Sequence, residues 1–328
     1  MQRLLAGQQV NAMGLGCMNL SHAYGQPPSE DDGAKVLLAA LEAGVTHFDT
    51  AALYGFGKNE TLLGKVLKSH RDKFFLASKC GMTGVDGKRV IDGRPDTIKQ
   101  TIEEGLSRLQ TEVIDLYYLH RWDKNVPVED SVGALADLVK AGKIKAIGLS
   151  EVSADTLRKA HAVHPIAAVQ TEYSLWTRNA EIAMLDTCKE LGAAFVAFSP
   201  LARGFLGGKM QANMDWVKGD IRAGMPRFQP DALAHNLSLL PPLQAIADEL
   251  GCTLAQLSLA WVLAQGEHVH AIPGTTSVKH LQDNMQAANI VLSAEQVAKI
   301  NAAFDDKQVQ GPRYPAPTQA EIDTEEFA

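Results

Sequence analysis

The sequence predicts an α/β fold, the (β/α)8 TIM barrel, on three observations. Short apolar runs alternate with helical patterns along the 328 residues, at intervals of roughly 30 residues. The runs are continuously apolar, as is typical of parallel strands covered on the outside by helices. Eight such runs occur in a chain of 328 residues, a length that suits one barrel. We therefore expect a single domain over residues 1–328.

The expected elements follow one another in a regular order. A β-hairpin is expected over 1–12, with Gly7-Gln8 as its turn. Strands are expected at 13–17, 45–50, 73–79, 113–120, 143–150, 166–170, 193–200 and 268–274. Helices are expected at 29–43, 58–68, 95–108, 129–140, 153–161, 178–190, 239–250, 253–265, 277–287 and 293–304, two of them extra to the barrel. A long loop at 201–230 and a Pro-rich tail at 305–328 complete the chain.

Composition and charge exclude several classes of protein. A doubly wound sheet is the alternative fold, but no GxGxxG turn follows the first strand. The net charge of −7 and the absence of a basic cluster argue against a nucleic-acid binder. No apolar run approaches the ~18 residues of a membrane span, and the first residues lack a signal-peptide core. The 4 cysteines are widely spread, so we expect free thiols, no metal site and a cytoplasmic protein.

Three consecutive strands are expected to end in polar residues. Asp49, Lys79 and His120 end these strands, and Tyr54 lies in the loop after the first of them. Active sites of TIM barrels lie at the C-terminal ends of the strands, and neighbouring strands are roughly 4.8 Å apart. Each residue alone has an ordinary explanation, as a cap, a solvated lysine, a core histidine or a surface aromatic. On one face and in complementary acid–base types, they predict a catalytic site.

The chemistry expected of these four side chains is carbonyl reduction. A phenol has a pKa of about 10, and a nearby ammonium lowers that pKa. Lys79 can do this for Tyr54, while Asp49 pairs with Lys79 and fixes its position. His120 can orient a bound carbonyl oxygen and help to relay the proton that Tyr54 donates. No protein side chain supplies a hydride, so the site needs a cofactor.

The chain resembles an aldo-keto reductase through motifs that span nearly its whole length. These are FDTAALYG, ASKCG, DLYYLHRWD, GLSEVS, VQTEYSLWTR, FSPLARGFLGG and IPGTTSVKHLQDN, in the family's order and spacing. The resemblance implies a barrel that binds NADPH in an extended conformation and reduces aldehydes or ketones, with Asp49, Tyr54, Lys79 and His120 as its catalytic tetrad. The IPG segment is similar to that of pyridoxal reductases and potassium-channel β-subunits, which makes pyridoxal a candidate substrate.

The resemblance also implies which residues hold the cofactor. Ser150 and Gln170 match the positions that bind the nicotinamide carboxamide, and Phe198 matches the ring that stacks on the nicotinamide. The loop over the pyrophosphate is matched by Ser199, Pro200, Leu201, Arg203, Gly204 and Lys209, although Arg203 and Lys209 can equally be surface charges. The adenosine end is matched by Gly274, Thr275, Thr276, Ser277, His280, Asp283 and Asn284.

Two departures from the family's pattern bear on the cofactor. Glu151 follows Ser150 where many relatives carry an asparagine. After the IPG segment, hydroxyl residues replace the basic residue that commonly holds the 2′-phosphate of NADP, and the nearest cationic candidates are Lys279 and His280. Hydroxyl groups hold a phosphate less strongly than arginine does. The resemblance favours NADP over NAD, and the missing basic residue makes this preference smaller.

The substrate pocket is expected to form from loops. These are Asn19–Tyr24, Arg121–Val126, 201–230 and the tail near Tyr314. Its expected aromatic walls are Tyr24, Trp122, Trp176, Trp216 and Phe228, of which Trp176 and Phe228 can instead pack their own loops. We expect a small carbonyl compound as the substrate and neither nucleic acid nor membrane as a partner.

Two other functions are compatible with a barrel. A cofactor-sensing module that regulates a partner protein needs a large exposed apolar patch, and no such run is present. A metal-dependent isomerase or hydrolase needs His and carboxylate ligands at the strand ends, where Lys79, Ser150 and Gln170 lie instead. Carbonyl reduction is therefore the expected function.

Overall fold

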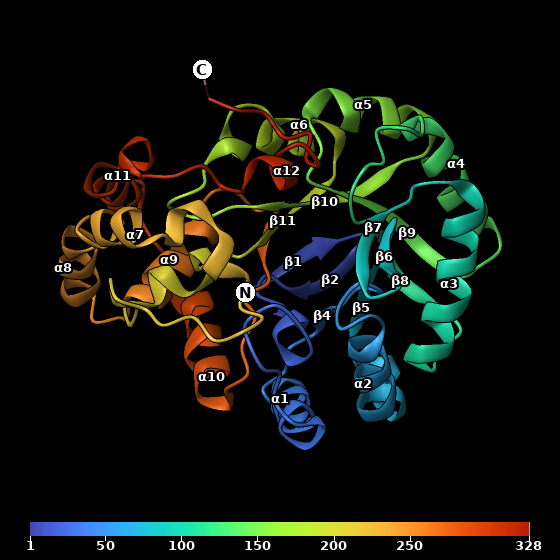
Figure 1. Cartoon of the computed structure of the whole chain (residues 1–328), viewed down its shortest axis with the longest axis horizontal. Coiled ribbons are helices and arrows are strands. Elements are labelled where there is room, and N and C mark those ends of the chain that lie inside the picture. Colours follow the sequence, from blue (N-terminus) through green and yellow to red (C-terminus); the bar gives the residue numbers. More distant parts are fainter. Residues whose placement is uncertain (328) are drawn as a thin grey trace.

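The computed structural model describes residues 1–327 and contains eight parallel strands in one curled sheet (Figure 1). The strand order is β12-β11-β10-β9-β8-β5-β4-β3. The bounds are β3 Leu15–Gly16, β4 His47–Asp49, β5 Phe75–Cys80, β8 Ile114–Leu119, β9 Ile144–Ser150, β10 Ile166–Glu172, β11 Ala194–Phe198 and β12 Val269–Ala271. The predicted α/β barrel fold is thereby confirmed.

The two edge strands of this sheet meet at a seam. Isolated parallel bridges join Met13 to Ala271 and Gly16 to Gly274. A Cβ atom on Gly16 would lie 2.7 Å from the carbonyl oxygen of Ile272, which is closer than carbon and oxygen pack. The close approach of β3 to the segment after β12 therefore depends on a residue without a side chain.

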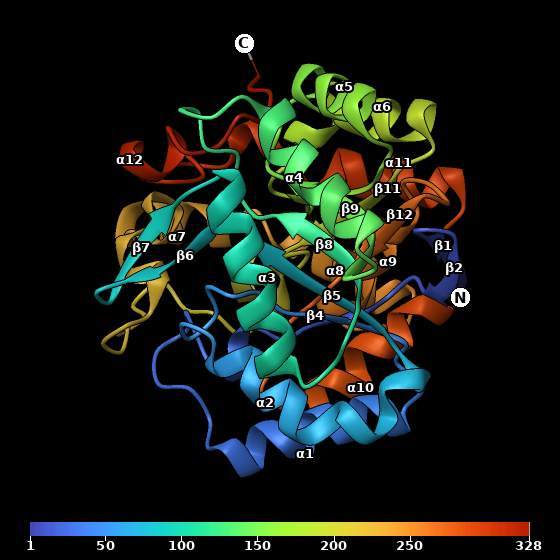
Figure 2. The same cartoon turned by 90° about the vertical axis from the view of Figure 1, so that its right-hand side faces the viewer.

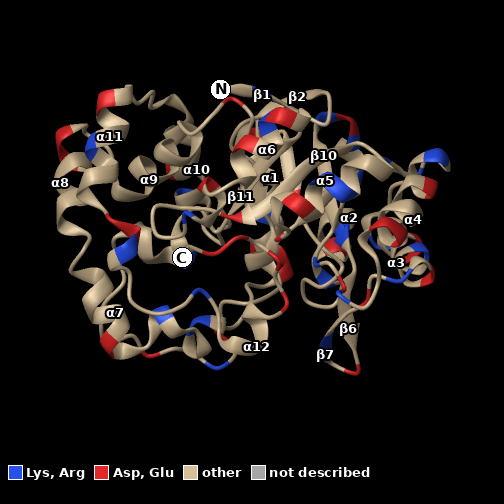
Figure 3. Ribbon diagram, turned by 90° about the horizontal axis from the view of Figure 1, so that it is seen from above, with Lys and Arg blue, Asp and Glu red and all other residues tan. Residues whose placement is uncertain are grey.

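Helices surround the strands, and most form a ring outside them, while the last one lies at one end of the barrel (Figures 1 and 3). They are α1 Glu30–Glu42, α2 Lys58–Leu67, α3 Pro95–Leu109, α4 Val128–Lys140, α5 Ala154–Val163, α6 Met184–Leu191, α7 Pro230–Leu237, α8 Pro241–Glu249, α9 Leu254–Leu263, α10 Val278–Gln286, α11 Ala294–Ala303 and α12 Ala316–Gln319. Short 3-10 helices are η1 Met18–Leu20, η2 Lys68–Lys73, η3 Asn179–Glu181, η4 Ala202–Gly207, η5 Ile221–Gly224, η6 Pro226–Phe228, η7 Ala287–Asn289 and η8 Asp306–Gln308. The Ser29 hydroxyl caps α1 by accepting from the Asp32 N–H.

Two β-hairpins lie at opposite ends of the barrel, as Figures 2 and 3 both show. The predicted N-terminal hairpin pairs β1 Gln2–Leu5 with β2 Gln8–Asn11, and Leu5 and Val10 pack against the side chains inside the barrel. Its turn is Ala6-Gly7, with φ of 49° and 76°, and not the expected Gly7-Gln8. The second hairpin, β6 Met82–Val85 with β7 Lys88–Ile91, lies at the end of the barrel where α12 also lies.

The structure corrects the sequence-based assignment in two helical regions. The helix expected at 178–190 is broken, because Ala183 has a φ of −153° between η3 and α6. Glu181 accepts hydrogen bonds from Tyr173 and Arg178, which hold this short turn in place. The loop expected at 201–230 contains η4, η5 and η6, and α7 follows it with Pro230 at its first turn.

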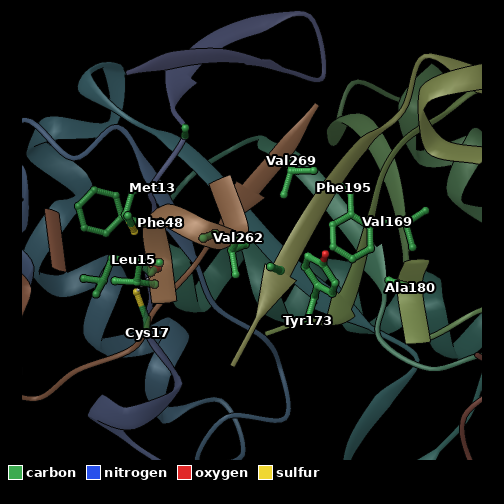
Figure 4. Close-up of a cluster of buried hydrophobic side chains, with 14 of the residues drawn as sticks. Met13, Leu15, Cys17, Phe48, Val169, Tyr173, Ala180, Phe195, Val262 and Val269 are labelled. Atoms are coloured by element: carbon green, nitrogen blue, oxygen red, sulfur yellow. Dashed lines mark hydrogen bonds between the residues drawn. The ribbon is translucent and has the colours of Figure 1, made fainter. Parts of the chain in front are cut away.

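The main hydrophobic core lies between the strands and the helix ring. Figure 4 shows part of it, with Leu15 and Phe48 on β3 and β4 and Phe195 on β11. The rings of Tyr173 and Phe195 meet edge to face at 5.6 Å between centroids. Over residues 1–327, no single helix is long and apolar enough to cross a membrane; only the bent pair Pro230–Glu249 and Leu254–Leu263 has the length and composition.

Candidate active site

The fold brings the four predicted catalytic residues together at the C-terminal end of the barrel. Asp49 is the last residue of β4, Lys79 lies one residue before the end of β5, and His120 directly follows β8. The register pairs Asp49 with Ala77, and the His120 N–H donates to the Cys80 carbonyl over 2.8 Å. Tyr54 lies in the turn after β4, so the strand ends set the position of each group.

Lys79 is the centre of this group, and its side chain is fully buried. Its ammonium nitrogen forms a short ion pair with Asp49, and it donates to the Thr50 carbonyl over 2.9 Å and to the Tyr54 hydroxyl over 3.1 Å. The expected roles of Asp49 as an anchor and of Lys79 as the neighbour of the phenol agree with this geometry. The three donor directions of the ammonium are thereby used.

The net pKa shift of Tyr54 differs from the sequence-based expectation. Burial raises the pKa of the phenol, and this effect exceeds the lowering by the Lys79 ammonium, so the net shift is upward. Burial also lowers the pKa of Lys79, but the charge of Asp49 and the contact with Tyr54 reverse that shift and raise it overall. At neutral pH the site therefore holds a protonated phenol beside an ammonium.

His120 completes the group as a neutral side chain. Its ring meets that of Tyr54 edge to face, with 5.8 Å between centroids. Burial, followed by the charges of Lys79 and Arg121, holds the pKa of His120 well below its ordinary value. Nδ1 is buried and makes no hydrogen bond to any residue of 1–327, which leaves Nε2 as the nitrogen available to a ligand.

A cleft of about 780 Å³ extends from this group across the C-terminal end of the barrel. Most of the residues predicted to be catalytic or to bind cofactor or substrate line it: Tyr24, Asp49, Tyr54, His120, Ser150, Gln170, Phe198, Ser199, Pro200, Leu201, Arg203, Gly204, Lys209, Gly274, Thr275, His280, Asp283 and Asn284. Lys79 lies behind its wall. Trp122, Thr276 and Ser277 do not line it.

The strand ends beside the catalytic group present polar side chains to the cleft. Ser150 is the last residue of β9 and pairs in register with Gln170 on β10. The Gln170 amide nitrogen donates to Asp49 over 2.7 Å, and no hydrogen bond reaches its amide oxygen in the described part of the chain. That oxygen is consequently an acceptor available at the cleft wall. Phe198 ends β11 next to them.

Arg203 is committed to an ion pair inside the protein. The sequence leaves open whether it reaches a pyrophosphate or lies on the surface, but the side chain is buried and Nη2 lies 2.8 Å from a Glu172 oxygen. Arg313 from the tail pairs with Glu172 and, over 2.8 Å, with Glu151. Tyr314 donates to Glu172 over 3.0 Å. These contacts tie the tail to the ends of β9 and β10.

Backbone conformation shapes the loop after β11. Ser199 and Arg203 have φ of 48° and 57°, and Gly204 has a φ of 94°. Such left-handed residues turn N–H groups toward one side of a loop and form anion-binding concavities. Lys209 also lines the cleft. The expectation of an anion site in this loop is therefore compatible with the backbone.

The opposite end of the cleft lies at the start of α10. The Ser277 hydroxyl caps this helix by accepting from the His280 N–H over 3.3 Å, and Ser277 N–H donates to Thr275. The hydroxyl of Ser277 is therefore engaged in capping. His280 and Asn284 still line the cleft from the first turns of α10, where free N–H groups favour an anion.

The expected tryptophan and phenylalanine walls do not line the cleft. Trp122 donates its indole N–H to Val126 within its own loop, and Trp176 is buried against Phe205 and Phe228. The apolar lining comes instead from Met18, Ala23, Leu53, Met82, Ile221 and Met225, together with Tyr24, Tyr54 and Tyr314. Of these, Met82 belongs to the β6–β7 hairpin, whose Asp86-Gly87 turn is a sequence signal for a hairpin.

Comparison with known proteins identifies the family. The profile of the "Aldo/keto reductase family" matches residues 12–305. The chain belongs to this family. It is 45% identical over 311 residues to "Probable aldo-keto reductase 1" of Glycine max, covering 94% of this chain and 89% of that protein.

This aldo/keto reductase shares its fold with solved structures of other proteins. A glycerol dehydrogenase of Gluconobacter oxydans is 28% identical with a TM-score of 0.84, covering 96% of this chain and 98% of that one. An aldo/keto reductase of Klebsiella pneumoniae, in complex with NADP and acetate, is 27% identical with a TM-score of 0.72, covering 96% and 98%. Over residues 1–327, no group of three His, Cys, Asp or Glu side chains is arranged to hold a metal ion.

Proposed function

We propose that this aldo/keto reductase reduces aldehydes or ketones to alcohols with NADPH, and that Tyr54 donates the proton. The observation that carries the proposal is the buried ammonium of Lys79, which joins the Asp49 carboxylate to the Tyr54 hydroxyl. Tyr54 and His120 both line the cleft, whereas Lys79 lies behind it. This arrangement presents one acid and one neutral imidazole to a bound carbonyl group.

The residues of the cleft fit a nicotinamide dinucleotide. The cleft volume of about 780 Å³ lies in the usual range of cofactor sites. Beside Tyr54, the Gln170 amide oxygen and Phe198 offer an acceptor and an aromatic face to a nicotinamide. The left-handed loop at Ser199–Gly204 and the start of α10 offer N–H groups to the phosphates. When bound, NADPH supplies the hydride that the carbonyl carbon accepts.

The side chains of this chain supply the rest of the reaction. The raised pKa of Tyr54 keeps the phenol protonated until negative charge develops on the carbonyl oxygen. The proton then passes from the phenol to that oxygen, and Lys79 stabilises the phenolate that forms. Neutral His120, through Nε2, orients the oxygen by a hydrogen bond. Asp49 holds the ammonium in position.

The preference for NADP over NAD rests on the adenosine end. Relatives that bind NADP or NADPH share this fold, including the enzyme of Klebsiella pneumoniae. In this chain His280 and Thr275 line the cleft there, and the Thr275 hydroxyl accepts from the Ser277 N–H. We expect a 2′-phosphate to bind these groups and the start of α10, with less affinity than an arginine would give.

Turnover tests the proposal directly. The purified chain is mixed with NADPH and para-nitrobenzaldehyde or pyridoxal, and the nicotinamide absorbance is followed; we expect it to fall. Tryptophan fluorescence, titrated with NADPH and with NADH, measures binding separately, and we expect the tighter binding for NADPH. Absence of both turnover and binding would contradict the proposed function, and equal binding of the two cofactors would contradict the stated preference.

A further inference from the structure

A buried arginine beside the catalytic group has no acidic partner. Arg121 follows His120 after β8, lines the cleft and is 9% exposed. Nη1 donates to the His120 carbonyl over 2.7 Å and to the Ser150 hydroxyl over 3.2 Å. Nε and Nη2 make no hydrogen bond, and no carboxylate lies within ion-pair distance, among residues 1–327. One edge of the guanidinium is therefore unsatisfied.

Other cations at this end of the cleft are paired. Lys79 pairs with Asp49, and Arg89 of the β6–β7 hairpin pairs with Glu321 over 2.6 Å. An arginine does not lose its proton in a protein, so burial of an unpaired guanidinium has a cost that a pKa shift does not relieve. Burial of a charge without a partner is unfavourable. An anionic ligand would remove that cost.

The surroundings of His120 favour an anion as well. After burial, the positive charges of Lys79, Arg121 and Arg89 each lower the pKa of His120. Because Lys79 and Arg89 have carboxylate partners, Arg121 is the cation of these three that has no acidic partner among residues 1–327. The apolar lining from Leu53 and Met82 leaves room for a carbon skeleton between the charges. Nε is fully buried, so Nη2 is the unpaired guanidinium nitrogen that a carboxylate oxygen in the cleft can reach.

We propose that Arg121 binds a carboxylate on the substrate, so that this reductase acts on aldehydes or ketones that carry an acidic group. The proposal rests on the proposed function, because it assigns the substrate class of the same cleft. In this role Arg121 contacts the substrate but not the reacting carbon. Its bonds to the His120 carbonyl and the Ser150 hydroxyl hold the guanidinium in place.

A pair of matched substrates tests the assignment. The full chain with NADPH is assayed on para- and meta-carboxybenzaldehyde and on their methyl esters, in which the distal group carries a methyl in place of the negative charge. Of the two acids, we take the one with the higher kcat/KM, and we expect its kcat/KM to exceed that of its own methyl ester. Arg121→Met should lower kcat/KM for that acid roughly 10- to 100-fold, the loss of a charged hydrogen bond, and change that of its ester by less than about 3-fold. Arg121→Lys should restore part of the loss.

Equal losses on acid and ester would mean that Arg121 positions His120 or the cofactor and would overturn the proposal. So would a wild-type enzyme that prefers the esters. A binding measurement keeps this outcome separate from failure of the reductase function. Benzoate and neutral benzamide are titrated by calorimetry into the chain saturated with NADP. Benzoate should bind, and Arg121→Met should weaken the binding of benzoate but not that of benzamide. If benzoate does not bind, or binds equally to the wild type and to Arg121→Met, the proposed contact of Arg121 with a carboxylate is refuted, even when no aldehyde is reduced.

Discussion

Replacing Lys79 with methionine separates the structural role of the ammonium from its chemical role. Lys79 is fully buried, and its removal leaves the Asp49 carboxylate, 2% exposed, with the Gln170 amide as its remaining side-chain donor. An uncompensated buried charge costs about 3–5 kcal/mol. We therefore expect Lys79→Met to lower the free energy of unfolding by about 3–5 kcal/mol and to abolish turnover.

The double variant Lys79→Met with Asp49→Asn is the matched control. It removes both charges while keeping the shape of the site and the contact with Gln170, so most of the lost stability should return. Turnover should stay absent, because the Tyr54 hydroxyl no longer has an ammonium 3.1 Å away to stabilise the phenolate.

Equilibrium urea denaturation and NADPH oxidation with para-nitrobenzaldehyde measure the two effects on the same preparations. A single variant as stable as the wild type would show that the buried ion pair does not hold the site together. A double variant that reduces the aldehyde at the wild-type rate would refute the role of Lys79 in the proton transfer.

Two further changes test the packing of the barrel. His47 and His270 are fully buried, and burial lowers the pKa of each to about 3. Because each histidine binds a proton more readily in the unfolded chain, the free energy of unfolding should decrease as the pH falls from about 6.5 toward 3. At pH 5 each histidine should lower the free energy of unfolding by roughly 2 kcal/mol relative to pH 7. His47→Leu should halve this pH dependence in urea denaturation, and an unchanged pH dependence would contradict the role of the buried histidines. A Cβ on Gly148 would lie 2.3 Å from the Tyr118 ring, so Gly148→Ala should lower the free energy of unfolding by about 1–3 kcal/mol, measured as a lower thermal midpoint. Gly133→Ala, on α4 with nothing within 4 Å, is the control and should stabilise by about 0.5–1 kcal/mol; similar shifts for both variants would refute the clash.

The strand ends were predictable from the sequence because parallel strands end at one edge. Asp49, Lys79 and His120 follow continuous apolar runs, and the barrel topology alone places their side chains on a common face. The net pKa shift of Tyr54 was not predictable in the same way. Its sign depends on how much burial outweighs one ammonium, and burial is a property of the whole cleft.

Long-range pairing explains the features that the sequence did not predict. Arg203 was expected near a phosphate or on the surface, but Glu172, 31 residues earlier, and Tyr314, 111 residues later, bind it inside the protein. No local sequence pattern indicates such distant partners. The β6–β7 hairpin is different, because its Asp86-Gly87 turn between two short runs is a local signal that the helix–strand alternation obscured.

The most direct test of the account is the reaction of Tyr54→Phe. Phenylalanine keeps the ring and its contact with His120 but removes the hydroxyl that lies 3.1 Å from the Lys79 nitrogen. We expect NADPH binding, followed by tryptophan fluorescence, to stay close to that of the wild type, while the rate of NADPH oxidation with para-nitrobenzaldehyde falls about 100- to 10,000-fold. Wild-type turnover by this variant would contradict the assignment of Tyr54 as the proton donor.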